Sequence, residues 1–296
     1  MSDQPSRPTT DATDSRQFST PLSSQQSTQM STPCGKPFTP PTARTLIAIP
    51  IFNEVGYLDG VIKRVRCYHQ DILFVDDGST DGTAEALDKI ADAGTAQVLR
   101  HETNQGYGRA LINAFDHAHS HGYEWVITMD CDEQHDPALL PCFFDAINDN
   151  DADIVSGSRY MASFDDDDLP PAERRRVNCT LTSNLNEIFD STLTDSFCGF
   201  KAHRVQPTVD LDLDEAGYAF PMQLWPRAFG AGLRIREIPV KLIYNDPNRS
   251  FGGNLDQVDQ RLQHYLDVLN RELALLDRPA LDVAEARRLA IADGCS

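Results

Sequence analysis

The sequence lacks the features that would point to a membrane span, a secretory route or a nucleic acid. No stretch approaches the ~18 to 20 uncharged apolar residues of a membrane span, and the N-terminus has no signal-peptide core. Basic residues are few: 26 Lys and Arg stand against 45 Asp and Glu among 296 residues, a net charge of −19. Because nucleic-acid binding needs a basic surface, such partners are not expected. The sequence predicts a cytoplasmic protein without a transmembrane segment, and peripheral contact with a membrane surface stays open.

Cysteine pairs with the spacing of zinc or redox sites are missing too. The seven cysteines are scattered and odd in number, without a C-x-x-C pair. We therefore expect reduced thiols, as in a cytosolic protein. The seven are Cys34, Cys67, Cys131, Cys142, Cys179, Cys198 and Cys295.

Three segments differ in composition. Residues 1–43 are rich in Ser, Thr, Gln and Pro without hydrophobic periodicity, which predicts a disordered tail. Residues 44–253 alternate short apolar runs with helical patterns and are expected to form one domain. Residues 254–296 carry leucines at helical spacing, which predicts an amphipathic helical segment. We expect this segment to pack back on the domain, with a membrane-surface or dimer contact as the alternative.

Apolar runs such as "TLIAIP", "DILFVDD" and "WVITMD" are typical of strands that are covered on both faces, with crossover helices between them. This pattern predicts an α/β fold with a mainly parallel sheet. Polar side chains follow the C-terminal ends of three runs, the edge at which open α/β sheets bind ligands. These side chains are Asn53 and Glu54, Asp76 and Asp77, and Asp130 and Asp132.

Asp130 and Asp132 in "MDCDEQHDP" are alternate residues at the end of an apolar run, so both carboxylates can point to one position. Mg²⁺ and Mn²⁺ prefer oxygen ligands and often share them with substrate phosphates. Gln134 can add an amide oxygen. The spacing therefore predicts a site for Mg²⁺ or Mn²⁺, and a solvated acidic turn is the alternative.

Two further turns are ambiguous by themselves. The carboxylates of "DDGSTDGT" can accept hydrogen bonds from ribose hydroxyls and base N–H groups, or the segment can serve as a turn with a helix cap. In "NQGYGRA", Gly106 and Gly108 could let a phosphate approach a helix N-terminus. The third glycine of a dinucleotide fingerprint is absent there.

The chain resembles the family 2 glycosyltransferases in a series of motifs. In chain order these motifs are "IPIFNE", "VDDGSTDGT", "NQGYGRA", "MDCDEQHDP", "VSGSRY", "TDSFCGFKAHR" and "GYAFPMQ". The similarity is to their branch of dolichyl- or polyprenyl-phosphate mannose and glucose synthases, and it covers about Thr45 to Gly253. It implies a GT-A fold, Rossmann-like, in a single domain. It also implies a GDP- or UDP-hexose donor, a Mg²⁺ or Mn²⁺ ion, a polyprenyl phosphate acceptor, and inversion at the anomeric carbon.

The resemblance also assigns residues to the site. It places the nucleotide-sugar donor on Pro50, Phe52, Glu54, Asp76, Asp77, Asp130 and Arg249. It places the metal on Asp130, Asp132 and Gln134. The acceptor phosphate is assigned to Arg159, Arg176 and Thr180, and the catalytic functions to Asp132, Asp195 and Arg176.

The chain departs from the family pattern at two positions: Gln223 stands where many relatives carry Glu, and Cys198 replaces the usual Ser. A phosphate monoester is largely ionised at neutral pH, whereas a sugar hydroxyl needs a general base. The neutral amide of Gln223 thus favours the phosphate, and Asp195 is the candidate base if the acceptor is a saccharide or protein hydroxyl. Two other classes stay open: an aspartyl-nucleophile phosphohydrolase, which also uses D-x-D, and a catalytically silent nucleotide-binding protein.

Overall fold

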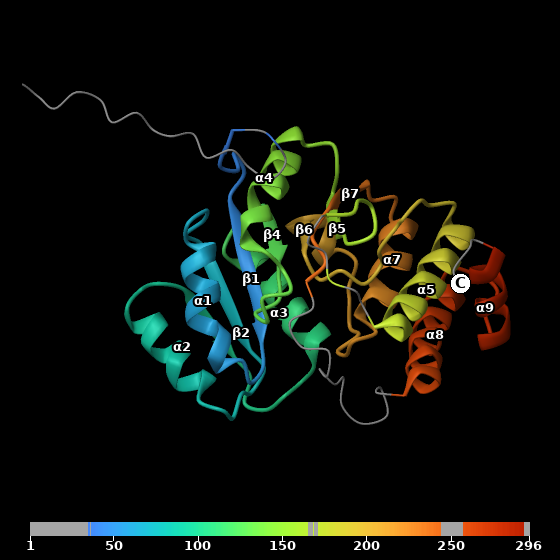
Figure 1. Ribbon diagram of the computed structural model, residues 1–296, viewed down its shortest axis with the longest axis horizontal. Helices are drawn as coiled ribbons and strands as arrows, with labels where there is room; N and C mark the ends of the chain where they lie inside the picture. The colour runs from blue at the N-terminus through green and yellow to red at the C-terminus, as the bar shows by residue number, and fades with distance from the viewer. Residues whose placement is uncertain (1–34, 36, 165–167, 169–170, 244–256, 293–296) are drawn as a thin grey trace, which may run out of the picture.

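The computed structural model describes residues 35, 37–164, 168, 171–243 and 257–292. Across this part of the chain runs a seven-stranded sheet with the order β3-β2-β1-β4-β6-β5-β7 (Figure 1). The strands are β1 Thr45–Ile51, β2 Ile72–Asp76, β3 Gln97–Arg100, β4 Trp125–Thr128, β5 Ile154–Ser158, β6 Lys201–Arg204 and β7 Ile235–Pro239.

Most strand pairs are parallel. β1 pairs with β2 and β4, β2 with β3, and β5 with β7, all in parallel. β6 is antiparallel to both of its neighbours, β4 and β5. The prediction of an α/β fold with a mainly parallel sheet is therefore confirmed.

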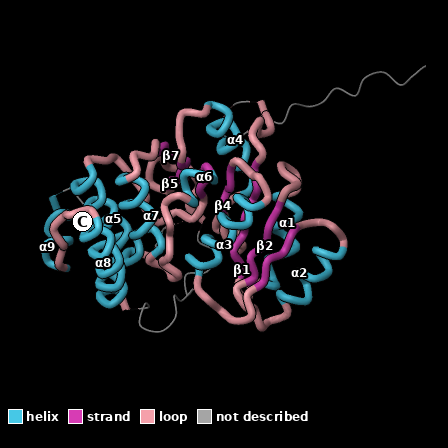
Figure 2. Tube along the Cα trace, turned by 180° about the vertical axis from the view of Figure 1, so that it is seen from behind, coloured by secondary structure: helices cyan, strands magenta, loops and turns pink. Residues whose placement is uncertain are grey.

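Helices cover both faces of the sheet, as Figure 2 shows from behind. Leu46 and Ala48 of β1 belong to one core cluster, and Ile47 and Ile49 belong to the other, as expected for side chains that alternate along a strand. The first cluster includes residues of α3 (Tyr107–Ser120), α5 (Ala172–Phe189), α7 (Phe220–Gly230) and α8 (Val258–Leu275). The second includes residues of α1 (Val55–Val65), α2 (Thr83–Asp92) and α4 (Leu140–Asp149). The remaining helical elements are η1 (Pro137–Leu139), α6 (Val205–Val209) and α9 (Val283–Ala292).

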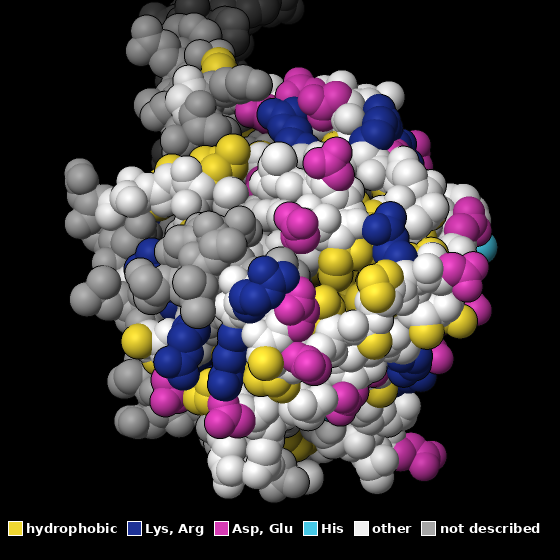
Figure 3. All heavy atoms as spheres, turned by 90° about the vertical axis from the view of Figure 1, so that its right-hand side faces the viewer, with side chains coloured by type: hydrophobic (Ala, Val, Ile, Leu, Met, Phe, Trp, Pro, Cys, Tyr) yellow, Lys and Arg dark blue, Asp and Glu magenta, His cyan; other side chains and the backbone are white. Residues whose placement is uncertain are grey.

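α5, α7, α8 and α9 gather at one end of the molecule (Figure 1). In α8, Leu262, Leu266, Leu269 and Leu273 are buried in the first core cluster, so this helix packs on the domain. Figure 3 shows basic and acidic side chains interspersed on this end of the molecule, without a continuous basic surface. Within the described residues, no helix combines the length and apolar composition of a membrane span.

The chain contacts the domain before Arg44. The Phe38 ring packs against the rings of Tyr68 and Phe144, with centroids 6.1 and 6.3 Å apart. Thr42 donates from its backbone N–H to Asn148 Oδ1 over 2.8 Å. Of the predicted tail, residues 1–34 and 36 lie outside the described residues, while residues 38–42 contact α4 and the loop after α1.

The cysteines require a correction. We expected seven reduced thiols, but Cys142 and Cys179 are each disulfide-bonded, whereas Cys67, Cys131 and Cys198 keep their thiols. The spacing of the cysteines in the sequence did not indicate these disulfides, because the fold brings disulfide partners together. Disulfides are typical of oxidising compartments. Cysteine usage therefore no longer supports the cytoplasmic prediction.

Candidate functional site

A pocket of about 550 Å³ opens beyond the carboxyl ends of β1, β2, β4 and β5. Its lining combines acidic residues that follow β2 and β4 with three arginines, Arg159, Arg174 and Arg261, which come from the end of β5, from α5 and from α8. In an α/β sheet this edge is where ligands bind, because the loops that leave the strands can vary without disturbing the sheet.

Asp77, directly after β2, anchors the loop that leads into α3. Its carboxylate accepts the Gln105 and Gly106 backbone N–H groups over 2.7 and 2.9 Å. It also lies 2.6 Å from His101 Nδ1, and His101 Nε2 lies 2.8 Å from the Asn113 amide nitrogen. Because an amide NH₂ can only donate, this network assigns the His101 proton to Nδ1. Asp77 thus lines the pocket in a fixed orientation.

Asp76 has a different environment from Asp77. It is fully buried and accepts from the Ser79 backbone N–H over 3.0 Å and from Arg100 Nε over 2.9 Å, and it does not line the pocket. Two side chains of the same turn reach the start of α1: Thr83 Oγ1 accepts from the Glu54 N–H, and Asp81 Oδ2 accepts from the Val55 N–H. The "DDGSTDGT" segment therefore ties the ends of β1 and β2 together.

The D-x-D residues lie in the pocket as well. Asp130, Asp132 and Gln134 all line it. Asp130 Oδ1 accepts from the Tyr107 hydroxyl over 3.1 Å, and the Asp130 backbone N–H donates to His135 Nδ1 over 2.8 Å. Burial lowers the pKa of His135 to about 4, so a neutral ring accepts this bond at neutral pH. His135 thereby fixes the backbone of the first aspartate.

The chemistry of this donor set bears on the expected metal. Among the residues that the structure describes, no three His, Cys, Asp or Glu side chains form a metal cluster. Two carboxylates and the amide oxygen of Gln134 are hard oxygen donors on one pocket. This set fits an ion such as Mg²⁺ or Mn²⁺, which commonly takes its remaining ligands from substrate phosphate and water.

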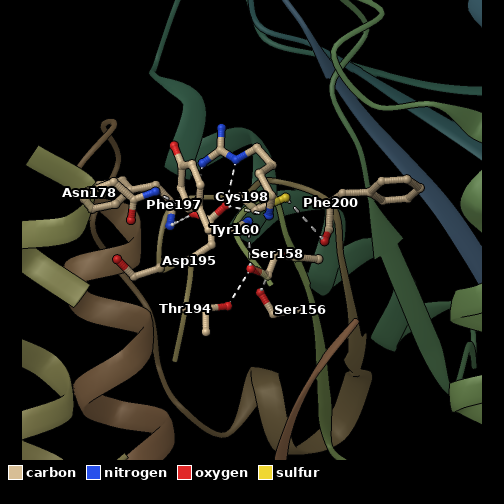
Figure 4. Close-up of polar contacts among 12 residues, drawn as sticks. Ser156, Ser158, Tyr160, Asn178, Thr194, Asp195, Phe197, Cys198 and Phe200 are labelled. Carbon is tan, nitrogen blue, oxygen red and sulfur yellow. Dashed lines mark hydrogen bonds and ion pairs between the residues drawn. The ribbon is translucent and has the colours of Figure 1, made fainter. Parts of the chain in front are cut away.

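Arg159 follows β5 and is paired with the buried Asp195. Arg159 Nε and Nη2 donate to Asp195 Oδ2 and Oδ1 over 2.7 and 2.9 Å. Figure 4 shows Asn178 beside Asp195, and the Asn178 amide donates to Oδ1 over 2.7 Å. Burial alone would raise the pKa of Asp195, but the charge and hydrogen bonds of Arg159 lower it to about 2. The pair holds the guanidinium at the pocket, while Asp195 itself is fully buried behind it.

α5 presents one face to the pocket, and this face carries Arg174, Val177 and Asn178. These positions have the i, i+3, i+4 spacing of one helical face. Arg176 lies two residues from Arg174, about 200° around the helix, and its side chain is exposed outside the pocket. Thr180 is buried and does not line the pocket either.

The predicted site residues thus divide into three groups. The pocket brings together Pro50, Phe52, Glu54, Asp77, Asp130, Asp132, Gln134 and Arg159. It leaves out Asp76, Arg176, Thr180 and Asp195. Arg249 lies outside the described residues, so its predicted contact with the donor stays a prediction.

Sequence reasoning missed several lining residues, among them Arg174, Asn178, Tyr218, Arg261 and Tyr265. Arg261 and Tyr265 have the i, i+4 spacing of one helical face of α8, and both are buried. Burial raises the pKa of Tyr265 to about 12, while the charges of Arg261 and Arg174 oppose that rise. All three side chains line the pocket. The helical spacing of α8 was visible in the sequence, but nothing there showed that this helix reaches the pocket.

The glycines of "NQGYGRA" have a different role from the one considered above. A Cβ on Gly106 would clash with the carbonyl oxygen of Ala216, and a Cβ on Gly108 would clash with that of Glu215. The Arg109 N–H donates to the Ala216 carbonyl over 3.1 Å. The glycines therefore admit a protein loop, residues 214–218, against the start of α3.

Gln223 and Cys198, the two departures from the family pattern, are both fully buried. Gln223 is fully buried in α7 and does not line the pocket, so its neutral amide cannot bear on the acceptor as we had argued. Burial raises the pKa of the Cys198 thiol to about 11, which keeps it protonated at neutral pH.

Comparison with known proteins shows the family of the chain. Residues 46–206 match the sequence model of "Glycosyl transferase family 2". The polyprenol monophosphomannose synthase of Mycolicibacterium smegmatis is 34% identical over 209 residues, which cover 68% of this chain and 77% of the relative. The undecaprenyl-phosphate mannosyltransferase of Micrococcus luteus is 30% identical over 213 residues, which cover 70% and 86%.

Two solved structures have a similar fold. The glucosyl-3-phosphoglycerate synthase of Mycobacterium tuberculosis, in complex with phosphoglyceric acid, has a TM-score of 0.58 at 17% identity, over 80% of this chain and 81% of that one. S. aureus TarS 1-349, in complex with UDP-GlcNAc, has a TM-score of 0.51 at 16% identity, over 83% and 70%. These similarities confirm the predicted GT-A fold.

Proposed function

Because the chain belongs to glycosyl transferase family 2, we propose that it transfers a hexose from a GDP- or UDP-hexose to a polyprenyl phosphate. The main structural support for this proposal is a single pocket that is lined both by the D-x-D carboxylates and by three arginines. The names of the two relatives, a polyprenol monophosphomannose synthase and an undecaprenyl-phosphate mannosyltransferase, support this acceptor. Since a polyprenyl phosphate resides in a lipid bilayer, the protein would work at a membrane surface.

The donor is assigned to the acidic part of the lining. Pro50, Phe52, Glu54 and Asp77 would contact the nucleoside, since the carboxylates of Glu54 and Asp77 can accept from ribose hydroxyls and base N–H groups. Asp130, Asp132 and Gln134 would hold Mg²⁺ or Mn²⁺ beside the donor diphosphate. When bound, such an ion neutralises charge that develops on the departing nucleoside diphosphate. Without a cation, the aspartates would repel the diphosphate.

The acceptor phosphate is assigned to the arginines. Arg159, Arg174 and Arg261 line the same pocket and come from three different elements. Guanidinium groups bind phosphate oxygens through charge-assisted, often bidentate hydrogen bonds. Three of them in one pocket supply hydrogen-bond donors for a phosphate on a protein whose net charge is −19, and the charge of Arg159 is balanced by its pairing with Asp195. This arrangement is suited to a phosphate monoester.

In the proposed reaction, a phosphate oxygen of the acceptor attacks the anomeric carbon of the hexose. The bond from that carbon to the donor diphosphate breaks, and its electron pair leaves with the nucleoside diphosphate. A single displacement of this kind inverts the anomeric configuration. An ionised phosphate has no proton to lose, so the step needs no general base.

The environment of Asp195 favours a phosphate over a hydroxyl acceptor. Asp195 is the base candidate for a hydroxyl, but it is fully buried and paired with Arg159. With a pKa of about 2, it is a weak base at neutral pH. We infer that Asp195 is a positioning residue that holds the Arg159 guanidinium at the acceptor phosphate.

The test is transfer of radiolabelled hexose from GDP- and UDP-sugars, with Mn²⁺ or Mg²⁺, to a short-chain polyprenyl phosphate in detergent. A panel of free sugars and glycans provides the comparison. We expect a glycosyl lipid product and no transfer to the panel. Transfer to a hydroxyl acceptor alone, abolished by Asp195→Asn, would overturn the lipid-phosphate proposal and leave the glycosyltransferase family unaffected.

A further inference from the structure

The Gln223 side chain in α7 uses its full hydrogen-bonding capacity inside the protein. Its Oε1 accepts the backbone N–H groups of Asp214 and Glu215, both over 2.8 Å. Its Nε2 donates to Asp214 Oδ1 over 2.5 Å and to Glu272 Oε1 in α8 over 2.9 Å. A neutral amide has two donors and two acceptor positions, and all four are used here. Replacement by an apolar side chain would leave several of these groups unsatisfied.

Three carboxylates and three arginines surround this amide, and Arg271 Nε lies 3.1 Å from Glu272 Oε1. Glu272 is buried and pairs with Arg227 of α7, Nε to Oε2, over 2.7 Å. Arg271 of α8 lies 3.4 Å from Asp214 and 3.7 Å from Glu215. The hydrogen bond from Gln223 lowers the pKa of Asp214, and the charges of Arg271, Arg227 and Arg109 of α3 act in the same direction.

The loop that Gln223 holds, residues 214–218, reaches the pocket. On its other side it packs on the start of α3, where the two glycines of "NQGYGRA" allow close backbone contact. At its end, the Tyr218 ring stacks on the Tyr107 ring, with centroids 5.8 Å apart and planes at 16°. The Tyr107 hydroxyl donates to Asp130 of the D-x-D motif. A continuous series of contacts therefore joins α8 to the first aspartate of that motif.

We propose that Gln223 is a positioning residue for donor binding: its neutral amide fixes the 214–218 loop, so that Tyr218 and Tyr107 hold Asp130 in its binding orientation. This inference rests on the proposed function only in assigning the donor to Asp130. An amide is needed because both acceptors of Nε2, Asp214 and Glu272, are carboxylates. A carboxylate at position 223 would be repelled by both, and a protonated carboxyl could donate to one of them.

The test compares Gln223→Glu, Gln223→Met and the full wild-type chain. The measured quantity is the dissociation constant of GDP and UDP with Mn²⁺, by calorimetry, between about pH 5.5 and pH 8. We expect both variants to bind about tenfold or more weakly than wild type at pH 8. Only Gln223→Glu should recover toward wild-type affinity at pH 5.5, because its introduced carboxyl is buried beside Glu272 and Asp214 and regains a proton there.

A second readout needs neither nucleotide nor metal. Amide hydrogen exchange of residues 214–218, corrected for intrinsic rates, should accelerate in Gln223→Glu at pH 8 and return to the wild-type value at pH 5.5. Gln260→Glu, the same change at an exposed position of α8, is the matched control and should match wild type throughout. Affinity and exchange of Gln223→Glu that equal wild type at pH 8 would overturn the inference. The inference would also be wrong if Gln223→Glu loses as much nucleotide affinity as Gln223→Met at pH 8 and does not regain it at pH 5.5.

If Gln223→Glu does not fold, Tyr107→Phe tests the last contact of the series, without which Gln223 cannot position Asp130. This variant keeps the ring stack and removes the hydroxyl that donates to Asp130. We expect Mn²⁺-dependent nucleotide affinity to fall about tenfold, and unchanged affinity would refute the positioning role. All these readouts are independent of the acceptor. A failure to glycosylate polyprenyl phosphate would therefore count against the proposed function without affecting this result.

Discussion

Arg174→Ala is the sharpest test of the acceptor site, because the neighbouring Arg176 provides a matched control. Arg174 lines the pocket, whereas Arg176 is exposed on another side of the same helix. A lost charge-assisted contact to a phosphate costs about 1.5 to 3 kcal/mol. At about 1.4 kcal/mol per factor of ten, kcat/KM for polyprenyl phosphate should fall by about tenfold to 150-fold in Arg174→Ala. Arg176→Ala should stay within about twofold of wild type.

The assay measures initial rates of hexose transfer at varied acceptor concentration, with the donor saturating. Nucleotide affinity with Mn²⁺ and the midpoint of thermal unfolding are measured for both variants, and neither should change. The reasoning is refuted if Arg176→Ala loses transfer and Arg174→Ala does not, since α5 would then present its other face to the acceptor. Equal losses in donor affinity and in acceptor use would also refute it, because they would assign Arg174 to the donor.

Three further outcomes follow. Asp132→Ala should abolish Mn²⁺-dependent binding of GDP- or UDP-sugar, measured by calorimetry. If a correctly folded variant still binds the sugar nucleotide with Mn²⁺, the metal assignment is wrong. A chain that starts at Ala43 should bind donor normally but lose about 1 kcal/mol of unfolding free energy, measured by denaturant titration, because Phe38 no longer packs on the domain. The pKa values of Asp153 and Asp195 are both lowered to about 2. Their stabilisation is present above about pH 4 and is lost as the pH falls through 2, so the free energy of unfolding, measured by denaturant titration, should drop over that range, by about 2 kcal/mol for Asp195 alone.

The part of the pocket that we assign to the donor was largely predictable from the sequence. Polar residues that directly follow apolar strands must lie at one edge of a parallel sheet, so Asp77 and Asp130 could be placed near each other without coordinates. Asp76 shows the limit of this reasoning. It is the last residue of β2 and Asp77 is the next residue along, and consecutive residues on a strand point in opposite directions. Only the fold shows which of the two carboxylates faces the ligand.

The arginine part was less predictable, because it depends on helix orientation and on contacts between distant segments. Three consecutive arginines precede Val177, and a motif match by spacing alone selected Arg176. The buried positions Val177, Leu181 and Leu185 define the inner face of α5 and favour Arg174, three residues before Val177. Arg261 has no comparable signal, since it lies beyond the matched family region of residues 46–206.

The distribution of charge in the pocket would determine which of the two proposed substrates binds where. Both proposed substrates carry phosphate, and the protein is strongly acidic, so each must be neutralised locally. A diphosphate next to Asp130 and Asp132 is favourable only with a divalent ion between them, whereas a phosphate monoester next to Arg159 and Arg174 is favourable without one. Exchanging the two substrates would leave a monoester against carboxylates. The pairing of Arg159 with Asp195 adds orientation to this selection, because a bidentate partner fixes the plane of the guanidinium. Electrostatics would therefore orient the two substrates, with the metal-bound diphosphate on the aspartates and the acceptor phosphate on the arginines.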